Sequence, residues 1–451
     1  MLTRTLFVLF LAASQLPAAG FRAGTARLDI TPDGPIWMSG YASRKKPSEG
    51  VLQRIWAKAL AVEDRHGAKA VIVTTDLIGL PHQVTDVAAA RLQKQFGLDR
   101  SAILFNSSHT HTGPIVWPNL QIMLDPSPVA EKQLQDYAAR LADTLVNVAG
   151  AALGDLHPAT LTIGHGSVGF AVNRRQPTPS GVKIGVNPNG PVDHDVPVLR
   201  VTGTDGKLIA ILFGYACHNT TLTGEHYQLS GDYAGQAQAF LEEKHPGANA
   251  LFLMLCGGDQ NPNPRTQIAN VIAHGHALAD EVDRVMGAPM KPLRPPVRTA
   301  FRTVEPKFAP RERADFEREA QSTDPFRVRR AQAMLAGYDR GAPVRRLTYP
   351  IQAIRFGKDL TIVALGGEVV VDYALRLKRL YGTEKENLVV AGYSNDVMCY
   401  IANKRILGEG GYEAVDSMIY YGQPGPLSEA AEETIVDGVK SVMERVGRKA
   451  Q

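Results

Sequence analysis

The chain has 451 residues, of which 44% are hydrophobic and 21% charged, a composition typical of a soluble globular protein with one large core or two ordinary ones. Its net charge of +4 is small for this length, and no block rich in lysine and arginine occurs, so nucleic acid is not expected as a partner. No obligate protein partner is indicated. The small positive net charge is compatible with peripheral contact of the protein with an anionic membrane surface.

The N-terminus has the three parts of a cleavable signal peptide. Arg4 precedes an apolar run at 5–13, and small residues follow up to Gly20. The run is too short to span a bilayer as a permanent helix. We therefore expect residues 1–20 to be removed and the protein to be secreted or periplasmic. A buried N-terminal helix is the alternative.

Short β-branched apolar runs alternate with amphipathic helical patterns along the chain. Strands are predicted at 57–62, 70–75, 102–106, 196–201, 208–215, 248–255, 347–356, 360–365 and 387–392. Helices are predicted at 83–96, 131–153, 235–244, 267–286, 310–337, 370–380 and 427–446. Two of the strand pairs, at 196–215 and 347–365, have the spacing of hairpins. The alternation predicts an α/β fold, with a mixed β-sheet core flanked by helices, in a single large catalytic domain over 21–451.

Three cysteines are too few for a disulfide scaffold, and at most one bridge can form. Cys217, Cys256 and Cys399 each lie beside a polar segment that follows a predicted strand. We expect them to be small buried side chains.

Polar clusters follow the predicted strands, where ligands gather in α/β sheets. They lie at 106–114, 215–221, 256–264 and 365–368, and the fifth comprises 392–400 with 408–413. Each cluster alone is also compatible with an ordinary turn or strand end. Their recurrence at strand ends favours a functional site.

The first two clusters supply histidines. On extended backbone the rings of His109 and His111 point to opposite faces, so one can bind a metal while the other has a separate role. His218 ends an apolar strand among small polar residues, which suits a metal ligand. Structural histidines with satisfied hydrogen bonds are the alternative for all three.

The later clusters supply acidic and amide groups. Asp259 and Asn261 follow a glycine pair and can orient neighbours, or they form an ordinary turn. Glu368 also follows a glycine pair and is expected to begin a helix, where a carboxylate is favourable in any case. Two histidines and a carboxylate are the ligands of hydrolytic zinc, which activates water and polarises a carbonyl.

These motifs resemble the catalytic domain of the neutral/alkaline non-lysosomal ceramidase family. The resemblance runs from about Phe21 to the C-terminus. It is carried by the segments 23–32, 38–41, 106–114, 173–174, 216–218, 258–263, 367–368, Tyr400 and Tyr412. The resemblance implies one catalytic Zn²⁺, held by His109, His218, Glu368 and Tyr400.

The resemblance also implies the groups that act on the substrate. His111 faces the substrate carbonyl, and Tyr412 helps to hold the developing oxyanion. Arg174 positions the substrate, although Arg175 is adjacent and the register between them is open. The expected catalytic residues are therefore His111, Arg174, Tyr412, Asp259 and Asn261.

The chain departs from the family pattern in two places. Asn261 stands where the family's Gly-Asp-x-Ser-Pro-Asn loop has serine, so a serine nucleophile is excluded there and zinc-activated water is the expected attacker. The sequence also ends where the family's C-terminal immunoglobulin-like domain would begin. Substrate access and membrane engagement are therefore expected to differ.

The expected activity is zinc-dependent hydrolysis of an N-acyl bond in a lipid, from ceramide to sphingosine and a fatty acid. The alternative is a zinc hydrolase of the same fold that acts on a different N-acyl or O-acyl compound. A secreted binding protein without activity is a rival from another class. A phosphoesterase is disfavoured because two-metal sites need more acidic ligands.

Overall fold

A computed structural model describes residues 20–124, 126–383 and 385–450. The predicted signal peptide, apart from Gly20, lies outside the described residues. Within the described part of the chain, no helix is long and apolar enough to cross a membrane.

The largest sheet has nine strands in the order β12-β10-β9-β6-β1-β3-β4-β5, with β14 paired to β6. Its strands are β1 (Phe21–Asp29), β3 (Trp56–Asp64), β4 (Lys69–Thr75), β5 (Ile103–Ser107), β6 (His157–Ser167), β9 (Asp195–Gly203), β10 (Leu208–Tyr215), β12 (Asn249–Met254) and β14 (Lys291–Pro292). The pairs β4–β5 and β10–β12 are parallel, and the other pairs are antiparallel. The sheet is therefore mixed, as predicted.

A second, four-stranded sheet packs against one face of the first. It has the order β15-β16-β17-β19 and consists of β15 (Val297–Val304), β16 (Tyr349–Phe356), β17 (Leu360–Leu365) and β19 (Asn387–Ala391). One apolar core, which includes Leu60, Leu212 and Ile362, fills the space between the two sheets. Strands such as β4 are buried on both faces, which explains their nearly continuous apolar sequence.

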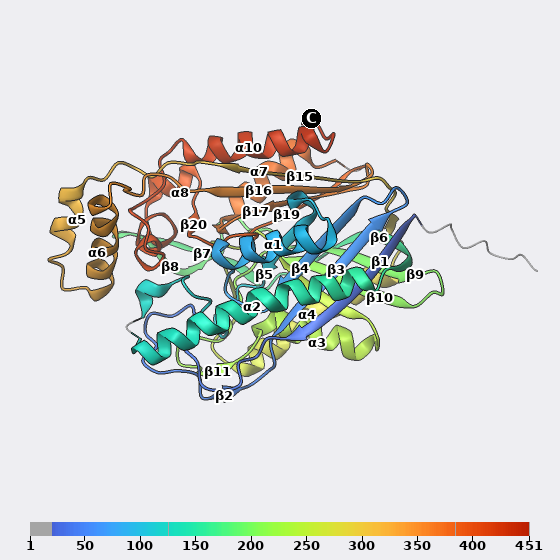
Figure 1. The fold of residues 1–451 in the computed structure, drawn as a ribbon, viewed down its shortest axis with the longest axis horizontal. Coiled ribbons are helices and arrows are strands. Elements are labelled where there is room, and N and C mark those ends of the chain that lie inside the picture. The colour runs from blue at the N-terminus through green and yellow to red at the C-terminus, as the bar shows by residue number, and fades with distance from the viewer. Residues whose placement is uncertain (1–19, 125, 384, 451) are drawn as a thin grey trace, which may run out of the picture.

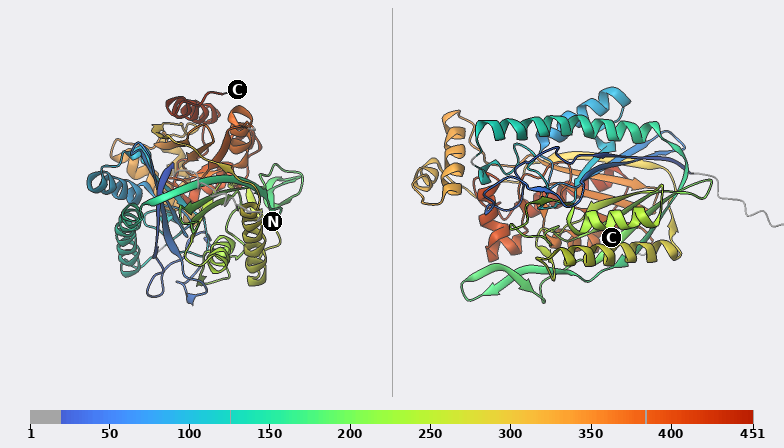
Figure 2. Two further views of the ribbon diagram at one scale, coloured as in Figure 1. Left: turned by 90° about the vertical axis from the view of Figure 1, so that its right-hand side faces the viewer. Right: turned by 90° about the horizontal axis from the view of Figure 1, so that it is seen from below.

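Helices cover the outer faces of both sheets, so the molecule has four layers (Figure 1). On the large sheet, α1 (His82–Phe96) and α2 (Pro128–Gly154) cover one half, and α3 (Asp232–Lys244) and α4 (Ile268–Gly287) cover the other. On the small sheet lie α7 (Val371–Tyr381) and α10 (Ala431–Arg445). The end-on view in Figure 2 shows these helices around the paired sheets.

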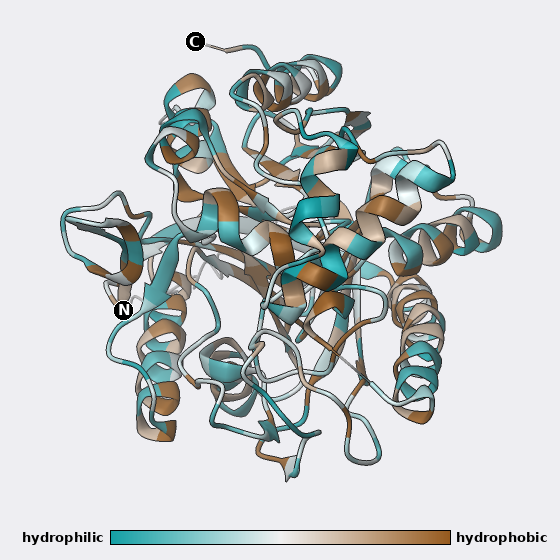
Figure 3. Cartoon of the chain, turned by 90° about the vertical axis from the view of Figure 1, so that its left-hand side faces the viewer, coloured by the Kyte–Doolittle hydropathy of each residue, from teal (hydrophilic) through white to brown (hydrophobic). Residues whose placement is uncertain are grey.

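Shorter elements gather at one end of the molecule, which Figure 3 views directly. They include α5 (Arg313–Glu319), α6 (Pro325–Asp339), α8 (Lys404–Glu409), the π-helical turn η3 (Tyr412–Asp416), α9 (Ser417–Tyr420) and the hairpin of β7 (Ala171–Thr178) and β8 (Gly181–Asn187). The remaining elements are β2 (Gly50–Val51), β11 (Gln228–Leu229), β13 (Gln260–Pro262), β18 (Glu368–Val369), β20 (Tyr400–Ile401), η1 (Arg100–Ala102) and η2 (Gln121–Met123).

The predicted fold class and both predicted hairpins are confirmed. All three cysteines are buried and free, as expected. Two helix predictions were wrong in extent. The segment 310–337 is two helices, because Asp324 caps a new helix that starts with Pro325. The last helix starts at Ala431 rather than 427, because Leu427 and Ser428 instead pair with the extended segment 307–308.

Candidate metal centre and catalytic cavity

The predicted site residues come from the ends of strands in both sheets. His109 follows β5, His218 follows β10, Glu368 follows β17, and Tyr400 lies beyond β19. These strands belong to the parallel pairs β4–β5, β10–β12 and β17–β19. Because parallel strands end at the same edge of a sheet, segments nearly three hundred residues apart meet there.

Asn106 joins the two edges of the large sheet at this end. Its Nδ2 donates hydrogen bonds to Met254 O at 3.2 Å and Gly392 O at 2.8 Å, and its Oδ1 accepts from Met254 N at 2.8 Å. These hydrogen bonds connect β5 with β12, the two edge strands of the large sheet, beside the end of β19. This link places the loop of His109 next to the loops that carry the other site residues.

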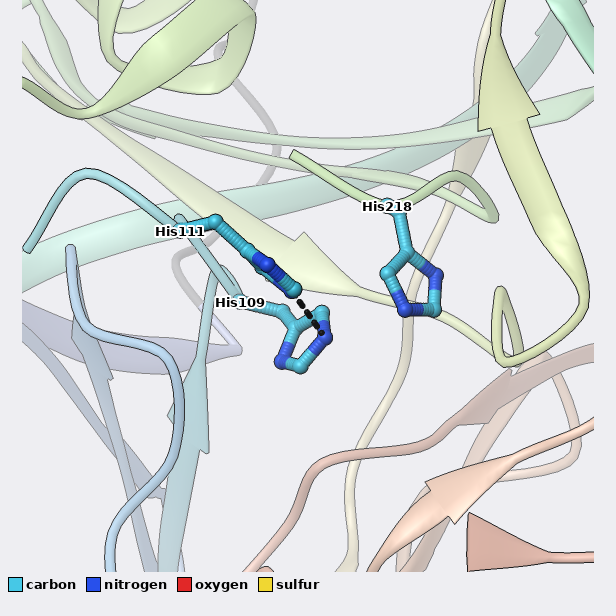
Figure 4. A group of neighbouring side chains, drawn as sticks. All are labelled: His109, His111 and His218. Carbon is cyan, nitrogen blue, oxygen red and sulfur yellow. Dashed lines mark hydrogen bonds between the residues drawn. The ribbon is translucent and has the colours of Figure 1, made fainter. Parts of the chain in front are cut away.

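The two histidines of the first cluster face each other, against the expectation from an extended strand. His109 has a left-handed backbone with φ of 64°, which turns its ring back toward His111. Their Nε2 atoms are 3.0 Å apart (Figure 4). With His218 they form a cluster in which one ring nitrogen from each histidine lies within 4.8 Å of the other two.

The tautomers of His109 and His218 are fixed by backbone carbonyls. His109 Nδ1 lies 2.6 Å from Ile78 O, and His218 Nδ1 lies 2.7 Å from Gly257 O. A carbonyl only accepts, so each Nδ1 carries a proton, and an imidazole in this tautomer presents its Nε2 lone pair to the site. Burial, with Arg174 and His109 nearby, lowers the pKa of His218 to about 3, so this ring is neutral at physiological pH.

Both lone pairs converge on the carboxylate of Glu368. Its Oε2 is 3.0 Å from His109 Nε2 and 3.1 Å from His218 Nε2. This oxygen is buried and receives no hydrogen bond among the described residues. Three electron-rich atoms at such distances repel one another unless a cation lies between them. The donor set therefore fits a metal ion.

Glu368 does not begin a helix, contrary to the prediction. It lies in β18, where it pairs in parallel register with Tyr400 of β20. This pairing brings the carboxylate and the phenol to the same place. The other carboxylate oxygen, Oε1, accepts a hydrogen bond from Tyr421 Oη at 2.5 Å. Tyr421 thus orients Oε2 toward the two imidazoles.

Tyr400 lies between a ring nitrogen and a guanidinium. Its Oη is 3.0 Å from His218 Nε2 and accepts a hydrogen bond from Arg174 Nη2 at 2.8 Å. Burial raises the pKa of Tyr400 well above its usual value, although Arg174 opposes this shift. The phenol is therefore neutral unless a cation binds to its oxygen.

A buried ion-pair network supports Arg174. Glu413 Oε1 accepts from Arg174 Nε at 2.8 Å, and Glu413 Oε2 accepts from Arg175 Nη1 at 2.5 Å. Arg175 continues outward to Glu409 at 3.0 Å. Arg174 therefore contacts Tyr400 and Asn261 directly, whereas Arg175 pairs with Glu413 and Glu409.

The site opens into a cavity of about 240 Å³. The predicted residues in its wall are His111, Arg174, Asn261, Tyr400 and Tyr412. His111 Nδ1 is buried and has no hydrogen-bond partner among the described residues. Its Nε2 lies 3.0 Å from His109 Nε2, which accepts in the tautomer set by Ile78 O, so His111 donates a proton from Nε2. Because the ring also lies in the cavity wall, it is placed to exchange a proton with a bound substrate.

Asn261 and Asp259 occupy different positions. Asn261 Oδ1 accepts from Arg174 Nη1 at 3.3 Å at the cavity wall. Asp259 lies behind that wall, where its carboxyl oxygens accept from Val371 N at 2.8 Å and Asn173 Nδ2 at 3.0 Å. Burial raises the pKa of Asp259 to about 7. These contacts hold the start of α7 and the segment before Arg174, so Asp259 acts on the site indirectly.

Three residues of the site carried no predicted role: Tyr421, Glu413 and Tyr393. The ring of Tyr393 packs 4.5 Å from that of His109, between centroids. Glu413 and Tyr393 lie in the last polar cluster, but nothing in their spacing distinguishes them. The neighbouring tyrosines at 420 and 421 are the only signal for Tyr421.

The sequence is similar to those of known proteins. The sequence model of the neutral/alkaline non-lysosomal ceramidase N-terminal region matches residues 21–273. The neutral ceramidase of Pseudomonas aeruginosa is 27% identical over 278 residues, which cover 58% of this chain and 40% of that protein. The neutral ceramidase of Mycobacterium tuberculosis is 23% identical, over 86% of this chain and 72% of that protein.

The fold is also similar to a solved structure. The crystal structure of the neutral ceramidase from Pseudomonas aeruginosa superposes with a TM-score of 0.74 at 19% identity, and the match covers 96% of this chain and 76% of that chain. At this identity the likeness supports the fold. The matched segments span well under half of the first curated relatives, 40% of the Pseudomonas protein and 36% of neutral ceramidase A from Dictyostelium discoideum.

Proposed function

This chain belongs to the neutral/alkaline non-lysosomal ceramidase family, and from that premise we propose that it is a zinc-dependent hydrolase of an N-acyl lipid. With ceramide as the substrate, the products are sphingosine and a fatty acid. The observation that carries the proposal is the buried Glu368 Oε2, which faces two imidazole lone pairs at 3.0 and 3.1 Å without a hydrogen-bond donor.

We assign the zinc ligands to His109, His218, Glu368 and Tyr400. Two nitrogens and two oxygens suit a catalytic zinc site. His111 lies in the same histidine cluster, but it differs because no backbone carbonyl holds its Nδ1 and because it lies in the cavity wall. These differences support a role for His111 toward the substrate rather than the metal.

When bound, zinc supplies polarisation of the substrate carbonyl and a lower pKa for water. The chain's own groups supply the rest. Burial and the neighbouring histidines lower the pKa of His111 well below its usual value, so the ring is neutral and can receive a proton or donate one from Nε2. Arg174 and Tyr412 border the same space and can hold the charge that develops on the acyl oxygen.

The size of the cavity indicates which part of the substrate enters. About 240 Å³ is below the range of roughly 300–1,000 Å³ that encloses a drug-sized ligand. The cavity therefore holds the amide and its polar surroundings, while long alkyl chains extend past the rim. Ile184 and Met123 contribute apolar surface to that rim, and Ile184 is half-exposed.

A second substrate class remains a candidate because of Asn261. Its side-chain oxygen accepts hydrogen bonds from Arg174 and Thr220, and it occupies the position of the family's serine. An amide at this position changes the hydrogen-bonding pattern presented to the substrate. The rival proposal is hydrolysis of a different N-acyl or O-acyl compound by the same zinc-dependent chemistry.

The test is a hydrolysis screen of the purified protein, with zinc content measured in the same sample. Ceramides, N-acyl amino acids and acyl esters are compared for wild type and Asn261→Ser. We expect ceramide turnover together with about one zinc per chain. Turnover only of the other acyl compounds would select the rival substrate. Full activity of a metal-free sample would contradict zinc dependence.

We also propose that residues 1–20 direct secretion or periplasmic export. N-terminal sequencing of the protein recovered from outside the cytoplasm would find a start near Gly20 or Phe21. An intact N-terminus at Met1 on the exported protein would contradict the proposed cleavage.

A further inference from the structure

A second cavity, of about 510 Å³, lies between the α5–α6 pair and the segment of η3 and α9. Four arginines border it: Arg311, Arg318, Arg327 and Arg330. Among the described residues, Glu319 is the only acidic one in its wall. Figure 1 shows α5 and α6 projecting at the end of the molecule where the short elements gather.

Glu319 neutralises only part of this charge. Its Oε2 accepts from Arg311 Nη2 at 2.8 Å, and its Oε1 accepts from Arg330 Nε at 2.9 Å. Arg330 is 5% exposed, and burial together with Arg311 and Arg327 lowers its pKa. The guanidinium groups of Arg311 and Arg330 thus share one carboxylate, that of Glu319. This leaves a net positive charge in a partly buried part of the wall.

The other two arginines are more exposed and have weaker partners. Arg318 pairs with Asp315 at the surface, and its side chain is 72% exposed. Arg327 lies 3.6 Å from Asp324 and 3.9 Å from Asp416, which are long distances for ion pairs. These groups are therefore available to an incoming anion.

The sequence concentrates positive charge in this region. Residues 311–346 contain nine arginines, no lysine and six acidic residues, a net charge of +3 out of the chain's +4. Arginine has a planar fork of donors that matches phosphate and carboxylate groups, whereas lysine offers a single point charge. The exclusive use of arginine favours recognition of an oxyanion over general solubility.

The cavity shares a wall with the catalytic cavity. Val415 and Ile419 face the arginines, while Tyr412 and Tyr420 of the same short segment border the catalytic cavity. Val415 is exposed and apolar, as are parts of the nearby rim such as Ile184. Cationic groups beside apolar side chains at the mouth of a lipid-binding cavity are the arrangement expected at a membrane interface.

We propose that this arginine-lined cavity binds a phosphate-type anion, through Arg318 and Arg327 at its mouth and Arg311 and Arg330 in its wall. The head group of an anionic lipid and inorganic phosphate share this chemistry. The site does not depend on catalysis, so it is tested separately from the proposed hydrolysis.

The experiment compares wild type with the double variant Arg318→Gln/Arg327→Gln. A matched control, Arg54→Gln/Arg284→Gln, removes the same charge from exposed arginines on other elements. Each protein is sedimented with phosphatidylcholine vesicles, with and without phosphatidylglycerol, and titrated with inorganic phosphate by calorimetry. Thermal melts verify that all three proteins are folded.

We expect wild type to bind the phosphatidylglycerol vesicles, and the cavity variant to bind about tenfold more weakly or worse than the control variant. Binding of inorganic phosphate alone, lost in the cavity variant, also supports the anion site and assigns it to the free ion. The proposal is overturned if wild type binds neither probe, or if the control variant loses as much affinity as the cavity variant.

Discussion

The two parts of the proposed metal centre are held in different ways. His109 and His218, from the region that matches the family model, are fixed by hydrogen bonds from Nδ1 to backbone carbonyls at strand ends. Glu368 and Tyr400, from the C-terminal region, are oriented by other side chains, namely Tyr421 and Arg174. The first pair therefore depends on sheet geometry, and the second on a side-chain network.

Because of this difference, the two pairs of residues should respond differently to substitutions around them. The backbone carbonyls that fix the histidines cannot be removed by substitution, so the imidazoles keep their orientation while the sheets remain intact. The carboxylate and the phenol lose their orientation when one supporting hydroxyl or guanidinium is changed. Substitutions in the C-terminal network should therefore give graded effects, whereas loss of any metal ligand should be severe.

The largest effect is expected from the ligands themselves, one from each region. His109→Ala and Glu368→Gln should each lower zinc content to near zero and turnover by about 10³-fold or more, because each removes a donor to the cation. Elemental analysis and hydrolysis assays measure both quantities. His157→Ala, an exposed histidine outside the site, is the control. Zinc retention in either ligand variant would contradict the assignment.

The buried network of the C-terminal region should be the next most sensitive. Glu413→Gln leaves the buried Arg174 without its carboxylate partner and leaves Arg175 paired with Glu409 alone, so it should lower the free energy of unfolding by about 3–5 kcal/mol. Glu433→Gln removes an exposed partner of Arg376 and should cost less than about 1 kcal/mol. Urea denaturation compares them. Equal losses would show that the network does not depend on burial.

The backbone-fixed region is tested through Asn106. Asn106→Ala removes the acceptor of the buried Met254 N–H and the donor to Met254 O and Gly392 O, and should lower the free energy of unfolding by about 3 kcal/mol. Asn249→Ala removes one partly buried hydrogen bond and should cost about 1 kcal/mol or less. If Asn106→Ala is as stable in urea as wild type, then the hydrogen bonds of Asn106 between β5 and β12 do not hold the loop of His109 in place.

Tyr421→Phe tests whether a side-chain hydrogen bond orients Glu368 in the C-terminal region. Loss of its hydroxyl removes the hydrogen bond to Glu368 Oε1, and zinc affinity should fall about 10- to 100-fold. Competition with a chelator measures this affinity. Tyr137→Phe removes a comparable buried hydroxyl far from the site and should leave zinc affinity unchanged. Equal zinc affinities in the two variants would contradict the role of Tyr421 in orienting Glu368.

The last prediction concerns pH. The pKa of His218 is about 3 in the folded state and near 6.5 when unfolded, so the unfolded chain takes up this proton first as pH falls. The metal-free protein should therefore be most stable above about pH 6.5 and lose stability toward about pH 3. Melting curves should show a shallower loss for His218→Asn and an unchanged loss for His157→Ala. Identical slopes for all three would contradict the buried neutral imidazole.

Much of the fold followed from the sequence, because strands buried on both faces are continuously apolar and their ends are marked by polar clusters. Strand β1 was missed because its pattern mixes small, basic and apolar residues, and only its first part is well buried. Ligands gather at the ends of parallel strands, so the sequence alone predicted that the polar clusters lie close together.

The finer geometry of the site could not be predicted. The left-handed backbone of His109 has no signature in a non-glycine residue, and it reverses the expected direction of one ring. The pairing of β18 with β20 involves two residues on each side, too few to leave a pattern. Tyr421 and Glu413 act through contacts between distant segments, so local spacing carries no information about them.

The most direct test is a crystal structure of the zinc-loaded protein with anomalous diffraction measured at the zinc edge. The account predicts one peak at bonding distance from His109 Nε2, His218 Nε2, Glu368 Oε2 and Tyr400 Oη, with His111 turned toward the cavity. A peak bound by all three histidines but not by Glu368, or no peak between the imidazoles, would contradict it.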